Sequence, residues 1–391
     1  MSSDVQKSAF YSTGFNKLMK IIKPLIFILI VILLSATALA TDTDDILTEQ
    51  REALFSESEL TDALPPDIAK ALEDNGISPD EDIKNLDIFG IIGSLLGNTL
   101  KNLKIPITIF GISIGVCLIC KFVLTLNPSE DIKKTINVVS TLSIAASAIL
   151  PAVDCIKYAG TVIKDCADFL LTFIPIFGSV LTVSGRPASA AMYSGTMVTV
   201  AEGSAQIGSN ILLPLCGIFL AISICGAVNS EINISSLTAN IKSFVTWGLG
   251  ILLTIFVGLL GAGTLVTASS DTVAVKGIKF MTGSFIPVVG GAVSDAMGSV
   301  NACMGLIKSS LGAYGIISLI MLFVPPLLSC IAVKASLSLS ASMAEILDVS
   351  GGKRLLSAAS DAMALVIAIL AALALLTIIS GGIITSMGTG G

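Results

Sequence analysis

The chain has 391 residues, of which 53% are hydrophobic and only 13% are charged, with a formal net charge of −6 and a mean hydropathy of +0.92. A soluble domain carries roughly a quarter charged residues, so we expect lipid to be the solvent for most of this chain. No histidine is present, which excludes Ser-His-Asp and Cys-His nucleophiles, HExxH zinc sites and histidine proton relays.

Residues 1–40 have the pattern of a secretory signal peptide. Lysines near the start are followed by the apolar core Leu25–Leu34, and Ala38-Leu39-Ala40 fits a signal-peptidase cleavage site. An uncleaved signal anchor is the alternative. Both interpretations place residue 41 on the extracytoplasmic side of the membrane, and the predicted orientation of the whole chain depends on this segment.

Residues 41–104 form an acidic segment that we expect to lie outside the membrane. It holds 15 acidic and 5 basic residues, more than half of the 28 acids in the chain. Helix-start signals at Ser78-Pro79 predict a small helical or partly disordered region. It is either a solvated spacer or a docking surface for a basic partner.

Residues 105–391 predict a polytopic membrane domain. Its apolar runs mostly meet the ~20 residues that a membrane-spanning helix needs. The predicted fold is an all-α polytopic membrane protein with about seven transmembrane helices, plus short re-entrant or interfacial segments broken by proline and glycine. The seven candidate spans are 105–126, 136–153, 167–183, 211–228, 244–266, 311–333 and 362–385.

One apolar phrase occurs twice in this domain. FIPIFG at Phe173–Gly178 returns as FIPVVG at Phe285–Gly290, 112 residues later. Each copy is followed by a stretch of small residues and two further spans, which favours an internal repeat with halves 165–267 and 277–386. The alternative is that two ordinary proline kinks arose by chance in an apolar chain.

Paired segments of this kind, interrupted by glycine and proline, indicate a transport site. Proline removes a backbone hydrogen bond and glycine permits an unwound chain, so freed backbone groups can line a water-filled cavity. The candidate path-lining or structural residues are Phe173, Ile174, Pro175, Gly178, Phe285, Ile286, Pro287 and Gly290.

Charged residues near the apolar runs are the second candidate feature. Ionisable groups within a membrane are functional candidates by default, although a position at the interface is the alternative. Asp271, Lys276 and Lys279 precede the second copy and Asp295 follows it. Asp165 and Asp168 enter the third span, and Glu202 lies in a stretch of small residues. We expect no metal site, because ligand types are too few and scattered, and no cofactor.

A resemblance to a known family rests on GTLVTASSDTVAVKGIKFMTGSFIPVVGGAVSDA (263–296), FIPIFGSVLTVSG (173–185) and ILLPL (211–215). The layout of a signal peptide, a short extracytoplasmic segment and a polytopic domain agrees with it. The chain resembles the stage III sporulation protein AE family of endospore-forming Firmicutes from about residue 90 to the end. The core K-F-x-T-G-x-F-I-P-V-x-G, Lys279–Gly290, is the most specific part.

The resemblance implies a non-enzymatic component of a channel-like, secretion-like complex that links mother cell and forespore. Such a protein would sit in the mother-cell-derived outer forespore membrane and would be needed for forespore development and late sigma-factor activity. The implied partners are other stage III sporulation A proteins, including a secretion-type ATPase and ring-forming proteins, stage II sporulation protein Q, and membrane lipid, but no nucleic acid. The alternative function is a stand-alone secondary transporter of a small solute.

Overall fold

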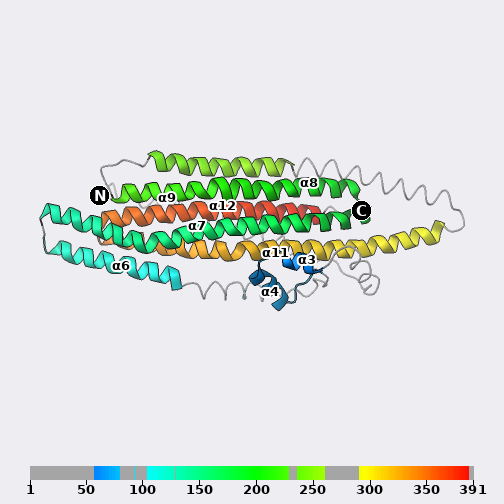
Figure 1. Ribbon diagram of the computed structural model, residues 1–391, viewed down its shortest axis with the longest axis horizontal. Coiled ribbons are helices and arrows are strands. Elements are labelled where there is room, and N and C mark those ends of the chain that lie inside the picture. Colours follow the sequence, from blue (N-terminus) through cyan, green and yellow to red (C-terminus); the bar gives the residue numbers. More distant parts are fainter. Residues whose placement is uncertain are drawn as a thin grey trace, which may run out of the picture.

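The computed structural model describes residues 57–79, 93, 104–127, 129–228, 236–259 and 290–386, and the predicted signal segment lies outside these ranges. Figure 1 shows an elongated bundle in which the long helices run side by side along one axis. Within the described ranges no strand occurs, which confirms the all-α class. The helices are α3 (Glu57–Asp62), α4 (Pro66–Asp74), α6 (Lys104–Thr125), α7 (Glu130–Val183), α8 (Pro187–Gly203), the π-helix η2 (Ser204–Leu212), α9 (Leu213–Val228), an unlabelled helix Ser236–Leu259, α11 (Gly290–Ile346) and α12 (Ser350–Ser386).

The polytopic membrane character is confirmed by the length and composition of these helices. Six stretches within the described residues are long and apolar enough to cross a membrane, namely Lys104–Thr125, Glu130–Val183, Pro187–Val228, Ser236–Leu259, Ser309–Ile346 and Ser350–Gly382. Seven spans were expected. The difference arises because the predicted spans 136–153 and 167–183 lie on one continuous helix, α7.

Continuous helices replace the breaks that the prolines predicted. α7 has 54 residues and runs through Pro151 and Pro175 without interruption, so it is about 81 Å long at 1.5 Å per residue. The stretch after it is also continuous, since α8, η2 and α9 follow one another without a loop. The physical reason is that a helix satisfies its own backbone groups where water is scarce. Each proline removes one amide donor, whereas an unwound segment would expose several.

The centre of the bundle is formed by α11, α12 and α7. α11 and α12 pack along each other and both pack against α7, and their apolar windows are the most buried in the described chain. α6 and the helix Ser236–Leu259 lie at the periphery, where large apolar side chains such as Ile119, Phe122 and Trp247 remain exposed. These exposed side chains suit a surface that faces lipid.

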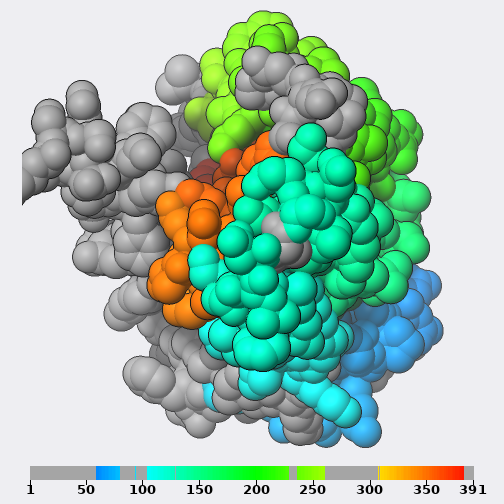
Figure 2. Space-filling model, turned by 90° about the vertical axis from the view of Figure 1, so that its left-hand side faces the viewer, coloured from blue at the N-terminus to red at the C-terminus, as the bar shows by residue number. Residues whose placement is uncertain are grey.

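Close glycine contacts set the register at one end of the bundle. A Cβ at Gly351 would collide with Thr141, and a Cβ at Gly352 would lie 2.7 Å from Ile144 Cδ1, so α12 begins in direct contact with α7. The Gly351 amide also donates a hydrogen bond to Asn137 Oδ1 at 3.4 Å. Figure 2 views this end, where α6 and the start of α7 face the reader. α7 and α12 are therefore neighbours, and α12 begins level with residues 137–144 of α7, beyond the start of that helix.

The described part of the acidic segment, residues 57–79, folds as two short helices on one flank of the bundle (Figure 1). Its apolar side chains are buried, with α3 contacting α7 and α4 contacting α11. Its acids point outward, and Asp67 lies near enough to Tyr158 and Asp165 of α7 to interact with them electrostatically. An acidic surface is thus fixed beside the middle of α7.

Candidate functional site

The first FIP phrase lies within α7 and faces the protein interior. Phe173 and Ile174 are 6% and 2% exposed, and Gly178 is buried, whereas Pro175 is exposed. Because the Pro175 ring is exposed, it does not press against a packed neighbouring helix. In this position the phrase is part of a helix–helix contact.

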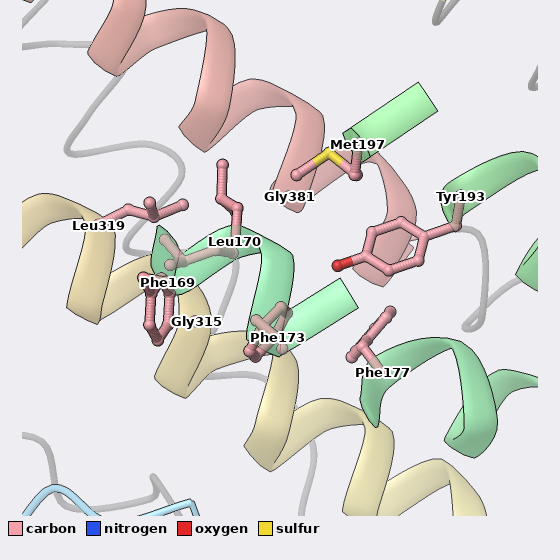
Figure 3. A pocket seen from close by; sticks show the side chains of 11 residues that line it. Phe169, Leu170, Phe173, Phe177, Tyr193, Met197, Gly315, Leu319 and Gly381 are labelled. Carbon is pink, nitrogen blue, oxygen red and sulfur yellow. The ribbon is translucent and has the colours of Figure 1, made fainter. Parts of the chain in front are cut away.

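Four aromatic rings continue from this phrase along α7 and onto α8. The ring centroids of Phe169 and Phe173 are 5.6 Å apart, those of Phe173 and Phe177 are 5.6 Å apart, and those of Phe177 and Tyr193 are 5.0 Å apart. We call this set the aromatic ladder. Figure 3 shows the ladder beside a small apolar pocket, with Gly315 of α11 next to it. Spacings of this size are favourable for aromatic pairs, so the ladder stabilises the joint between α7, α8 and α11.

Two glycines let neighbouring helices approach the ladder. A Cβ at Gly315 would lie 2.6 Å from Phe173 Cζ, and a Cβ at Gly178 would lie 2.9 Å from Ser194 Oγ. Small residues at helix contacts are the usual means of close approach in membranes. The structure therefore places the first FIP phrase in tight apolar packing.

The second FIP phrase lies almost entirely outside the described residues, as do the charged candidates before it. Gly290 begins α11 and Asp295 lies on that helix. The candidates outside the described ranges are Asp271, Lys276, Lys279, Phe285, Ile286 and Pro287. The predicted repeat, which needs both copies for comparison, stays a prediction.

A different polar feature occupies the middle of the bundle. Exposed polar side chains line the outer side of the joint between α7 and the α8–η2 helix. On α7 they recur at helical spacing, and on α8–η2 they recur every four residues. We call this set the polar face: Lys157, Thr161, Lys164 and Asp168 on α7, with Glu202, Gln206 and Asn210 on α8–η2.

Packing contacts fix the register of the two halves of the polar face. Gly160 of α7 lies against Ser209, and Gly208 of η2 lies against Ile163. Since α7 and α8–η2 are antiparallel, this register brings Gln206 level with Lys164, and Glu202 level with Asp168. The π-helix widens the turn here, and such segments are frequent at functional sites.

The charges on the polar face lack ionic partners within the described part of the chain. The ion pairs found there join Lys133 to Glu130, Lys242 to Asp361 and Lys353 to Glu345. None of them includes a member of the polar face. Two hydrogen bonds join members of the face: the Asn210 amide donates to Gln206 Oε1 at 3.1 Å, and the Thr161 hydroxyl donates to the Lys157 carbonyl at 3.3 Å. Unpaired charges of this kind are costly in hydrocarbon.

The far side of α8–η2 at the same level is apolar. Phe256 of the helix Ser236–Leu259 packs beside Gly203, because a Cβ at this glycine would lie 2.9 Å from Phe256 Cζ. On that helix Ile255, Val257 and Leu259 are exposed. At this level along its axis, the bundle therefore exposes apolar side chains on one side and charged side chains on another.

Comparison with known proteins explains the resemblance seen in the sequence. A family model described as stage III sporulation protein AE matches residues 73–388. The chain belongs to the stage III sporulation protein AE family. A curated member from Bacillus subtilis (strain 168), stage III sporulation protein AE, is 26% identical over 305 residues, which cover 78% of this chain and 74% of that protein. No solved structure matches.

Membership of the stage III sporulation protein AE family confirms the resemblance and gives the chain a role in sporulation. The match extends from α4 to the end of α12 and therefore includes both the aromatic ladder and the polar face. Within the described residues no three His, Cys, Asp or Glu side chains are grouped to hold a metal ion.

Part of the polar face could be recognised from the sequence. Asp165, Asp168 and Glu202 were noted as ionisable groups in apolar surroundings, but Gln206 and Asn210 were missed. Their spacing of four and eight residues from Glu202 places all three on one side of a helix. This pattern was available in the sequence, but the pairing of that side with α7 was not.

Proposed function

We propose that this chain is a non-enzymatic integral membrane component of the channel-like, secretion-like sporulation complex that links mother cell and forespore. It would serve forespore development and late sigma-factor activity. The observation that carries the channel part of the proposal is the polar face, whose charges have no ionic partner within the described residues. A protein that only anchored other subunits in lipid would need no such surface.

The partners that fit this function are the other stage III sporulation A proteins, including the secretion-type ATPase and the ring-forming proteins, together with stage II sporulation protein Q. The location that fits is the outer forespore membrane. The helices α3 and α4 would then face the space between the two membranes, where their exposed acids suit a basic partner. The docking of this segment on α7 and α11 supports a fixed presentation of that acidic surface.

The alternative of a stand-alone transporter depended on two broken segments. The first of them runs unbroken through α7, and the second lies outside the described residues. A transporter would accumulate a solute in vesicles without other subunits, and it would lose this activity on Asp271→Asn or Lys279→Ala.

The experiment that tests the proposal is complementation of an endospore-forming strain that lacks its own family member. Lys164→Leu with Asp168→Leu removes two charges from the polar face, four residues apart on α7. Asp131→Leu with Lys134→Leu is the matched control, because it removes the same two residue types from exposed positions at the start of α7.

We expect the first double variant to lose heat-resistant spores and the late forespore sigma-factor reporter, to the level of the uncomplemented strain, at unchanged protein abundance. The control should sporulate normally. Equal sporulation by both variants would remove the support for a channel role. A normal yield after deletion of the partner proteins would contradict membership of a complex.

A further inference from the structure

Two cysteines from different helices meet in the interior of the bundle. Cys155 of α7 and Cys330 of α11 are 8% and 0% exposed, and their thiols lie next to each other. Small residues about one turn to either side of Cys155, Ala152 and Ala159, are fully buried and let neighbouring helices approach α7 closely. Neither the aromatic ladder nor the polar face includes these cysteines, so the proposed function gives them no role.

The antiparallel register of α7 and α11 holds the two thiols together. The same two helices also meet where Gly315 lies against Phe173. Gly315 precedes Cys330 on α11, whereas Phe173 follows Cys155 on α7, and each interval is roughly four to five turns long. Two cysteines can be bonded without backbone movement only where they already face each other. Contacts at two levels keep α7 and α11 in the register that brings Cys155 to Cys330.

The acidic segment docks beside this thiol pair. Tyr158, one turn further along α7, lies near enough to both Cys330 and Asp67 of α4 to interact with them electrostatically. Asp67 and Glu73 are exposed on α4, and carboxylates of this kind need water. The predicted signal peptide directs residues 41–104 to the extracytoplasmic side. We therefore expect the thiol pair to lie at an extracytoplasmic level of the bundle, and disulfides form and persist on that side of a membrane.

We propose that Cys155 and Cys330 form a disulfide bond that fixes α7 to α11 beside the acidic segment. The oxidant is an extracytoplasmic protein with a reactive disulfide. The Cys155 thiolate attacks this disulfide to give a mixed disulfide, and the Cys330 thiolate then displaces the oxidant from Cys155. The two cysteines thus give up two electrons and two protons, and the oxidant leaves as a dithiol. Because both thiols are buried in the packed bundle, this exchange precedes the final packing of α11 on α7.

Cys166 provides an internal control for this inference. It lies three turns after Cys155 on the same helix and is 2% exposed, so its burial is similar. Its thiol lies next to Thr377 of α12 rather than next to a cysteine. A difference in oxidation between Cys155 and Cys166 therefore reports the facing cysteine and not burial in the bundle.

Sequential labelling of thiols in sporulating cells tests the inference on the unaltered full chain. Cells are quenched in acid, the protein is denatured with a light maleimide present, and it is then reduced and treated with a heavy maleimide. Mass spectrometry compares the two labels at each cysteine. At Cys155 and Cys330 the heavy label should exceed the light one by at least about tenfold, because structural disulfides resist reduction. Cys166 should carry the light label.

Single substitutions identify the bonded partner. In the Cys155→Ser variant, Cys330 should change to the light label, and in the Cys330→Ser variant Cys155 should do the same. The matched control Cys166→Ser should leave both with the heavy label. If Cys330 kept the heavy label in Cys155→Ser, it would be bonded elsewhere and the inference would fail.

The inference goes beyond the proposed function and fails separately from it. The light label on both Cys155 and Cys330 in the wild type would overturn the disulfide, while the complementation result for the polar face would stand unchanged. The wild-type labelling needs no variant, so it decides the question even if a serine substitution impairs folding.

Discussion

The contact between Gly315 and Phe173 gives the sharpest test of how the helices pack. A Cβ at position 315 would lie 2.6, 2.9 and 3.1 Å from Phe173 Cζ, Cε2 and Cε1, whereas unstrained carbon contacts lie near 3.5–4.0 Å. The ring must therefore move by roughly 1 Å. It cannot turn freely, because its centroid lies 5.6 Å from that of Phe169 on one side and 5.6 Å from that of Phe177 on the other.

Overpacking of this kind costs about 1–3 kcal/mol. Alanine is also a better helix former than glycine by about 1 kcal/mol, which offsets part of the cost. Gly217 of α9 supplies the matched control, because a Cβ there meets nothing within 4 Å. The difference in free energy of unfolding between Gly315→Ala and Gly217→Ala should therefore be about 1–3 kcal/mol, with Gly315→Ala the less stable.

The assay is unfolding of the purified full chain in detergent micelles, followed by circular dichroism during heating or during titration with a denaturing detergent. Phe173→Leu removes the ring atoms that clash, so Gly315→Ala should cost less in that background than in the wild type. Equal stability of Gly315→Ala and Gly217→Ala would refute the reasoning, because α11 would then not approach α7 at the aromatic ladder.

Three further predictions concern α7 and its neighbours. The Pro175→Ala variant should give a normal yield of heat-resistant spores and a melting temperature at or above that of the wild type. The reason is that Pro175 is exposed on an unbroken helix and alanine restores the backbone amide donor. Loss of spores would show that the proline has a role of its own. Lys242 Nζ and Asp361 Oδ2 are 3.6 Å apart, and both side chains are about half exposed. A double-mutant cycle with alanine at each position should therefore give a coupling in the free energy of unfolding of about 0.2–1 kcal/mol. Strict additivity of the two substitutions would mean that this pair does not hold the helix Ser236–Leu259 to α12. The thiols of Cys155 on α7 and Cys330 on α11 are buried and lie next to each other, so oxidation of the reduced chain by copper phenanthroline should join them and remove both from reaction with a maleimide after denaturation. The same maleimide count before and after oxidation would contradict this contact between α7 and α11.

Some features of the chain could be predicted from the sequence because they depend on local composition. Long apolar runs with few charges predicted helices that cross a membrane, and six such stretches are present in the described residues. The residues 263–296 carried the family resemblance, which the family match confirms. The spacing of Glu202, Gln206 and Asn210 also contained the information that they share one side of a helix.

Other expectations failed because they depend on neighbours. Pro175 was expected to interrupt a short segment, but the helix continues through it, since the cost of one missing hydrogen bond is smaller than that of an unwound chain in an apolar setting. Hydropathy measures how apolar a run is, not where a helix stops within the bundle.

The sequence by itself thus determined that the chain is a membrane protein, that it is helical, and to which family it belongs. The reason is that hydropathy and motif residues are local properties of the chain. Only the tertiary structure decided that the first FIP phrase packs against Gly315, and that charges from α7 and α8–η2 meet on one outer surface opposite an apolar one. The physical reason is that both features depend on which helices are neighbours and in what register. That choice is fixed by close contacts between residues far apart in the chain, such as Gly351 with Asn137 and Gly208 with Ile163.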